Sequence, residues 1–483
     1  MDRTTTETGT ESVAPANANV EGESPVVEAG ETTATATVHA GGVELERTIG
    51  ITGGLAIGVG TMVGAGIFVF PGLAAGRAGP AAAASFALGA VVALLVAVPC
   101  SELATAMPRS GGGYYYVSRV LGAPYGAAVG LGLWLGLVFA SGFYLVGFGQ
   151  YAAGVLAEVG VAVASAWPPT ALALGTGVLL TAVSVGGTEN SAAVQNLVVS
   201  ALLAILTVFL VYGGLDAAGI FGRRTAPEVF FRFGVPPVFT TAAFVFTAYL
   251  GFAQVATVAG DMKDPGRNLP LAMIGSVLVV AVLNVATVLV ATSAFGSEQL
   301  ARFGETALVD VARSYIGPVG AIVILVAGLL ATVSSANASI LSSSRAVYAL
   351  SRDALIPSWA SRLNFRYGTP HIALTLAGGP VLVLVAWGEV AVLAEVASFL
   401  HLVMYGLICV TLVVVRRRDP EWYDPAFRMP GVPWLPAVGA LASFGLLLLM
   451  SLRSQIIGLA VMVAAVGWYY AYARNVRLGG ALG

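Results

Sequence analysis

The sequence predicts an all-α membrane protein that crosses a bilayer about twelve times. Of its 483 residues, 57% are hydrophobic and only 10% are charged, whereas soluble domains carry roughly a quarter charged residues. Apolar stretches of about 18 residues or more recur along the chain, and each is long enough to cross a bilayer as a helix. These stretches are too long for barrel strands and do not alternate, so helices are the structure that satisfies their backbone in lipid.

Prolines and glycines separate the predicted spans, for example at 78–80, 167–169 and 265–266. Such residues punctuate helices because they favour turns. The predicted spans cover residues 49–73, 79–106, 122–157, 169–186, 188–214, 237–260, 268–295, 317–350, 371–388, 390–415, 434–452 and 455–473.

Charge is unevenly distributed along the chain. Residues 1–47 hold nine acidic side chains and two arginines, a composition typical of a disordered acidic tail. The termini and the even-numbered loops carry 16 of the 23 basic residues. This bias places both termini in the cytoplasm of a cell membrane, although Arg223, Arg224 and Arg232 lie on the opposite side. No basic patch indicates a nucleic-acid partner.

Glycines gather in the middle of the first span, ITGGLAIGVGTMVGAGIFVFPG. Each glycine costs a helix about 1 kcal/mol relative to alanine. An opening from Val63 to Ile67 would expose amides that suit a carboxylate, and carbonyls before the gap that suit a cation. Close helix packing through Gly60 and Gly64 is the alternative interpretation, and composition alone does not separate the two.

Small residues also interrupt the sixth span, at Ala248 and Gly251. Interruptions five spans apart fall at corresponding positions of two halves that start on opposite faces, which indicates an inverted repeat. The chain is therefore divided into a tail (1–47), a ten-span transport core (48–418, with repeats at 48–215 and 236–418) and two additional spans (430–475).

Four segments resemble motifs of the amino acid–polyamine–organocation (APC) permeases. They are GVGTMVGAGIFVFPG at 58–72, SELATAMPRSGGGYYYVSRVLG at 101–122, YLGFAQVATVAGDMKDPGRNLP at 249–270 and SSANASILSSSRAVYALSRDALIP at 334–357. Their order and spacing cover most of residues 49–420. The resemblance implies the leucine-transporter-type fold, a five-plus-five inverted repeat in which helices 1 and 6 are broken at the membrane midplane.

The resemblance also implies where a substrate binds on the first helix. The backbone amides of Ala65, Gly66 and Ile67 would hold a substrate carboxylate. Val63 and Gly64 would form the opening in front of them.

On the sixth helix, the resemblance implies that carbonyls near Phe246, Thr247 and Tyr249 receive the substrate ammonium. The rings of Phe246, Tyr249 and Phe252, beside Gly251, would close over the substrate side chain. Core or lipid-facing packing is the alternative interpretation for each ring.

A coupling ion is a further implication. Ser334 and Ser335 match the hydroxyl pair of sodium-coupled relatives, and would face the carbonyls of Gly60, Val63 and Ala331. The fifth span has no lysine, which removes one mechanism of proton coupling but leaves Na⁺, H⁺ and exchange open. No other cofactor is predicted.

Ionisable residues inside apolar spans suggest functional roles. Glu102 and Arg345 lie near the cytoplasmic ends of spans 2 and 8, and we predict that they pair as an inner gate, with anchoring near the headgroups as the alternative. Glu395 and His401 in span 10 are six residues apart and do not share a face. His401 is predicted to be an interior histidine rather than a proton relay.

The resemblance implies a secondary transporter of amino acids, and no cluster of titratable groups suggests a membrane enzyme. Apolar candidate contacts, without an acidic residue in helix 1 or 6, favour neutral amino acids as the small-molecule substrate. The alternatives are a transporter or exchanger of cationic amino acids or polyamines, and a permease-like sensor that does not transport.

Overall fold

The structure is a computed structural model. It describes residues 37–39, 42–44, 47, 49–108, 111–160, 168–186, 192–220, 229–362, 370–476 and 478. The chain divides into two units, of which the second starts at Arg47 and contains all the described helices. In the first unit, β1 (Thr37–His39) pairs antiparallel with β2 (Gly42–Glu44), a pair that the sequence does not predict. The remainder of the predicted acidic tail up to residue 46 lies outside the described residues.

Helices of the first half of the second unit correspond to the predicted spans, except that the first span is divided in two and one additional helix, α4 (Gly112–Leu121), lies between the second and third spans. The described elements are α1 (Ile51–Met62), α2 (Ala65–Ala78), the 3₁₀ turn η1 (Gly79–Ala81), α3 (Ala82–Ala106), α4 (Gly112–Leu121), α5 (Ala123–Glu158), α7 (Pro169–Val185) and α8 (Ala192–Ala217).

The second half begins with an interrupted span and contains two short helices before its longest one. Its elements are α9 (Pro236–Val245), η2 (Phe246–Tyr249), α10 (Phe252–Thr257), η3 (Ala259–Asp261), α11 (Pro265–Phe295), α12 (Ser297–Phe303), η4 (Gly304–Thr306), α13 (Ala307–Ile316), α14 (Pro318–Arg352), η5 (Ser358–Ser361), α15 (His371–Trp387), α16 (Val390–Arg418), α17 (Trp434–Leu448), α18 (Leu452–Trp468) and η6 (Tyr469–Ala473).

Among the described residues, eight helical segments are long and apolar enough to cross a membrane, and four further apolar helices are shorter. Large apolar side chains such as Leu197, Val282 and Leu441 are about 70% exposed, which suits a surface covered by lipid. The chain is therefore a multi-pass membrane protein. The count of twelve spans and the inverted repeat stay predictions.

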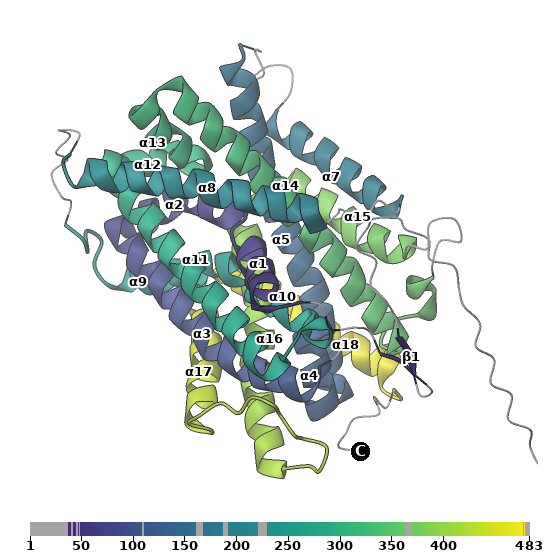
Figure 1. The fold of residues 1–483 in the computed structure, drawn as a ribbon. Helices are drawn as coiled ribbons and strands as arrows, with labels where there is room; N and C mark the ends of the chain where they lie inside the picture. Colours follow the sequence, from purple (N-terminus) through teal and green to yellow (C-terminus); the bar gives the residue numbers. More distant parts are fainter. Residues whose placement is uncertain are drawn as a thin grey trace, which may run out of the picture. The chain divides into compact units, whose positions relative to one another are not determined.

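The two longest helices, α5 and α14, pack along each other, and α16 packs against both α5 and α3. Beside them α1 packs against α10 and α11 (Figure 1). The short helix α12 covers α2, where Gly72 allows a close approach: a Cβ atom there would lie 3.0 Å from the Leu300 carbonyl oxygen. These contacts place the interrupted first span in the interior of the bundle.

Candidate functional site

The first span is interrupted at two residues. α1 ends before Val63 and α2 begins at Ala65, and the backbone of Val63 (φ −76°, ψ 75°) and Gly64 (φ −130°, ψ −145°) is not helical. The first amides of a helix have no partner within it, and no described side chain caps α2. The amides predicted to hold a carboxylate, Ala65 to Ile67, thus form the first turn of α2. The predicted opening is narrower than expected and ends at Gly64.

The interruptions of the first and sixth spans touch each other. A Cβ atom on Gly66 would lie only 3.0 Å from Ala248 Cβ and 3.2 Å from Ala248 Cα. One turn away, Thr61 Oγ1 donates a hydrogen bond to the Gly251 carbonyl at 3.0 Å, and a Cβ atom on Gly251 would lie 2.6 Å from that hydroxyl. Glycine at both positions lets the two backbones approach.

The sixth span is interrupted, but contrary to our expectation its backbone is not unwound. Residues Phe246–Tyr249 form a 3₁₀ turn, and Leu250 and Gly251 keep right-handed helical dihedrals. The Thr247 carbonyl accepts the Leu250 amide at 3.3 Å, and the Leu250 carbonyl accepts the Tyr405 hydroxyl at 3.0 Å. The Thr247 carbonyl thus keeps a partner within the span, while the Leu250 carbonyl takes a hydroxyl partner from α16, so the span is interrupted without being unwound.

The predicted aromatic rings lie beside the interruption but pack against protein. Phe246, Tyr249 and Phe252 are completely buried. The Tyr249 hydroxyl donates to the Phe86 carbonyl at 2.9 Å, and the ring centroids of Phe252 and Tyr405 are 5.0 Å apart. In this conformation the rings therefore have the core packing of the alternative interpretation, and their closure over a substrate stays a prediction.

Two of the predicted cation ligands lie next to Gly64. A Cβ atom on Gly64 would overlap the Ser335 hydroxyl and lie 3.9 Å from the Ala331 carbonyl oxygen. Thr332 Oγ1 bonds the Gly328 carbonyl one turn back at 2.8 Å, but Ser335 has no such bond within the described part of the chain. Its hydroxyl is therefore available beside the interruption. The ligand roles of all five residues, Gly60, Val63, Ala331, Ser334 and Ser335, stay predictions.

A cavity of about 380 Å³ approaches the interruption of the sixth span from one end of the bundle. Its inner wall comes from the middle of α5 and α16 and from α10, and its mouth from α4, η3 and the end of α14. The sequence identifies His401 and Arg345 as ionisable residues within apolar spans. It does not identify the other side chains that line the cavity. The lining includes Leu137, Leu250, Gln254, Asp261, Arg345, Arg352, His401 and Tyr405.

The opposite end of the bundle is closed by Arg77 and a group of rings. Arg77, in the last turn of α2, pairs with Glu395 at 2.8 Å, and its guanidinium lies 3.7 Å from the centroid of the Phe244 ring. Phe70 contacts Phe244 at 5.0 Å and stacks on Phe143 at 4.9 Å between centroids. A cation over an aromatic face and stacked rings are both favourable contacts, so Arg77 and these rings pack together at this end.

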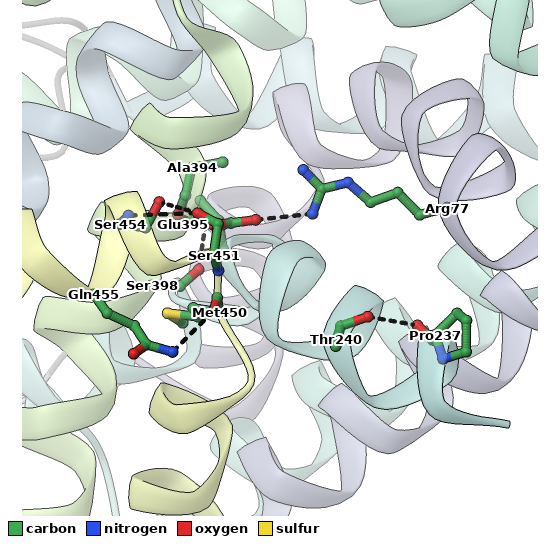
Figure 2. Close-up of polar contacts among 11 residues, drawn as sticks. Arg77, Pro237, Thr240, Ala394, Glu395, Ser398, Met450, Ser451, Ser454 and Gln455 are labelled. Atoms are coloured by element: carbon green, nitrogen blue, oxygen red, sulfur yellow. Dashed lines mark hydrogen bonds and ion pairs between the residues drawn. The ribbon is translucent and has the colours of Figure 1, made fainter.

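Glu395 connects the closed end to further segments. Figure 2 shows its carboxylate between Arg77 and Ser451, whose amide and hydroxyl both donate to it. The carbonyl of the preceding residue, Ala394, accepts the Thr247 hydroxyl at 2.7 Å. The first turns of α16 therefore hold α2, η2 and the start of α18 together.

Replacing Glu395 with glutamine is expected to loosen the closed end, because Arg77 loses its charged partner. A cysteine at Phe143 should then react about fivefold faster with a membrane-impermeant maleimide, the effect of losing about 1 kcal/mol. Glu389→Gln is the matched control, since it removes an exposed ion pair with Arg453. Equal labelling rates in the Glu395→Gln and unaltered backgrounds would contradict the gating role of the pair.

The predicted pair of Glu102 with Arg345 is wrong for this conformation. Glu102 is completely buried and accepts two hydrogen bonds from Arg416, at 2.6 and 2.8 Å, one from the Tyr423 hydroxyl at 2.7 Å and one from the Met429 amide at 2.7 Å. Burial and the bond to Glu102 raise the pKa of Tyr423, which keeps it a donor. Arg345 is exposed at the cavity mouth. A buried carboxylate needs several donors, and Arg416 with the following loop supplies them.

Known proteins resemble the chain over nearly its whole length. A family model described as amino acid permease matches residues 49–472. The branched-chain amino acid permease BcaP of Bacillus subtilis is 27% identical over 451 residues, 89% of this chain and 94% of the relative. The methylthioribose transporter of the same organism is 28% identical over 411 residues, 82% and 87% of the two chains. The serine/threonine exchanger SteT, also from Bacillus subtilis, is 24% identical over 449 residues, 88% and 97%.

These relatives are transporters and not enzymes, and the family match covers far more than half of the sequence. The chain therefore belongs to the amino acid permease family of the APC superfamily.

Proposed function

We propose that the protein is an ion-coupled secondary transporter that moves neutral amino acids by alternating access. The cavity of about 380 Å³ carries this proposal, because it reaches Leu250 in the interrupted sixth span from the end of the bundle that holds Arg345 and Arg352. Arg77 and Glu395 close the other end. Access to a midplane site from one side at a time is what this mechanism requires.

The substrate carboxylate is proposed to bind the first amides of α2, Ala65 to Ile67. These amides point out of a helix N-terminus, where the helix dipole also favours negative charge. The carbonyls near Phe246, Thr247 and Tyr249 would receive the ammonium once the 3₁₀ turn opens, and the ring of Phe252 would cover the side chain. Gly66 and Gly251 keep the two interruptions close enough for one zwitterion to reach both.

The charges around the cavity favour a neutral substrate side chain. Among the described residues that line the cavity, Asp261 is the one that carries a carboxylate, and it lies at the mouth together with Arg345 and Arg352. The inner wall carries Leu137 and Leu250 instead. A cationic side chain there would lose its hydration without gaining a counter-ion, which costs several kcal/mol. Cationic amino acids or polyamines, moved by uptake or exchange, are the second candidate substrates.

The protein is proposed to lie in the cell membrane with both termini in the cytoplasm. This orientation follows from the 16 of 23 basic residues that lie in the termini and the even-numbered loops. The cavity, with Arg345 and Arg352 at its mouth, would then open toward the cytoplasm. The Arg77–Glu395 pair would close the outer side.

Uptake by the purified protein in liposomes tests the function. Radiolabelled leucine, threonine, arginine and putrescine are offered separately, each with an inward Na⁺ gradient, an inward H⁺ gradient or neither. Saturable, gradient-driven accumulation of leucine or threonine supports the proposal. Accumulation of arginine or putrescine alone would select the second candidate, and binding without accumulation would indicate a sensor.

Na⁺ is proposed as the coupling ion, because Ser335 and Ala331 offer oxygen atoms beside Gly64 and hard cations prefer oxygen ligands. Ser335→Ala is expected to raise the Na⁺ concentration for half-maximal uptake about tenfold, the effect of losing one ligand worth about 1.4 kcal/mol. Ser344→Ala is the matched control, since that hydroxyl bonds the Leu341 carbonyl in the same helix at 2.8 Å. Uptake by the unaltered protein that ignores Na⁺ would overturn this assignment.

A further inference from the structure

His401 is held rigidly in the inner wall of the cavity. Its Nδ1 lies 2.8 Å from the Ala397 carbonyl oxygen. A carbonyl oxygen can only accept a hydrogen bond, so Nδ1 carries the proton. On one face of the ring, a Cβ atom on Gly136 would lie 2.9 Å from Nδ1 and Cε1. Glycine in α5 thus allows the helix to press against the imidazole and fix its orientation.

The other ring nitrogen, Nε2, faces the cavity. No residue in the described part of the chain forms a hydrogen bond with Nε2. Neighbouring atoms nevertheless leave part of this nitrogen accessible. His401 is only 3% exposed, and it lines the cavity. With the proton on Nδ1, Nε2 of the neutral ring is an acceptor without a donor.

This acceptor lies in apolar surroundings next to the interrupted sixth span. Leu137 and Met404 line the same wall. The ring of Tyr405 lies 6.2 Å from that of His401, and the Tyr405 hydroxyl is already engaged by the Leu250 carbonyl. A polar group that enters the cavity here meets Nε2 of His401 as an acceptor that no described residue occupies.

We propose that His401 is a specificity-determining residue that accepts a hydrogen bond from a hydroxyl group on the substrate side chain. Hydroxyl-bearing neutral amino acids are thereby preferred over apolar amino acids of the same shape. The inference rests on the proposed transport of neutral amino acids and deepens it. A site with a fixed acceptor favours a ligand that supplies the donor, because the acceptor is otherwise left unpaired when water is displaced.

Threonine and valine test this inference, since they differ only by a hydroxyl in place of a methyl group. The measured quantity is the ratio of kcat/KM for threonine to kcat/KM for valine in liposomes. We expect the unaltered protein to prefer threonine at least about tenfold. His401→Asn keeps a donor for the Ala397 carbonyl but removes the cavity acceptor, and should reduce the preference about tenfold. His401→Gln places an acceptor near the position of Nε2 and should retain it.

The outcomes separate this inference from the proposed function. Uptake of both amino acids with an unchanged ratio in His401→Asn, or with no preference for threonine in the unaltered protein, would overturn the specificity role alone. Failure of the unaltered protein to take up any amino acid would overturn the proposed function. If His401→Asn does not fold, Gly136→Ala replaces it, because the added methyl group displaces the ring. An unchanged ratio in that folded variant is again contrary to the inference.

Discussion

Valine at position 66 is expected to abolish uptake while the protein still inserts into the membrane. The Cβ atom would lie 3.0 Å from Ala248 Cβ and 3.2 Å from Ala248 Cα, and the further methyl groups of valine would force the first and sixth spans apart. We expect the initial rate of amino acid uptake to fall at least about 100-fold, which corresponds to about 2.7 kcal/mol. Uptake is measured in liposomes at matched protein content.

A glycine in open space provides the control for this variant. A Cβ atom on Gly175 in α7 would meet no neighbouring helix or side chain within 4 Å, so Gly175→Val tests the general effect of a β-branched residue in a helix. It should transport at nearly the normal rate. Normal uptake by Gly66→Val would show that the contact between the two interruptions has no part in transport.

Removing the Glu102 carboxylate is expected to cause the largest loss of stability. Glu102→Ala leaves Arg416 without its partner and frees the Tyr423 hydroxyl and the Met429 amide. Breaking a buried pair in this way costs about 3–5 kcal/mol. Thermal unfolding in detergent should therefore show a markedly lower midpoint, accompanied by release of the 419–433 segment to added protease.

An exposed pair serves as the control for Glu102. Glu298 pairs with Arg302, and their side chains are 63% and 77% exposed, so Glu298→Ala should leave the midpoint almost unchanged. The double variant Glu102→Ala with Arg416→Ala should lose less stability than the sum of the single variants. Strictly additive losses would mean that the two side chains act independently.

Local composition locates the interruption of the first span, but it does not by itself distinguish an opening from close helix packing. Glycines at 64 and 66 weaken the helix where α1 and α2 separate, and the same reasoning locates the interruption of the sixth span near Ala248 and Gly251. The conformation of that second interruption is not predictable from composition. It depends on hydroxyl groups of Thr61 and Tyr405, which come from distant parts of the chain.

Long-range charge pairing is also beyond what the sequence predicts. Glu102 and Arg416 are 314 residues apart, and Arg77 and Glu395 are 318 apart. Several arginines lie near the same end of the bundle as Glu102, and nothing in their spacing identifies the partner. The sequence predicts His401 to be an interior histidine, which agrees with the hydrogen bond of its Nδ1. It does not predict that Nε2 faces the cavity.

The one-sided cavity has a consequence for inhibition. If the protein works by the proposed alternating access, a compound that fills the cavity from its mouth acts as a wedge between α5, α10 and α16 and holds the conformation in which Arg77 pairs with Glu395. A ligand that binds one conformation lowers the population of the other. Such a compound would therefore inhibit uptake of substrate from the opposite side of the membrane, although the compound and the substrate enter the protein from different sides. A higher substrate concentration on the opposite side would overcome this inhibition only to the extent that the protein still exchanges between the two conformations.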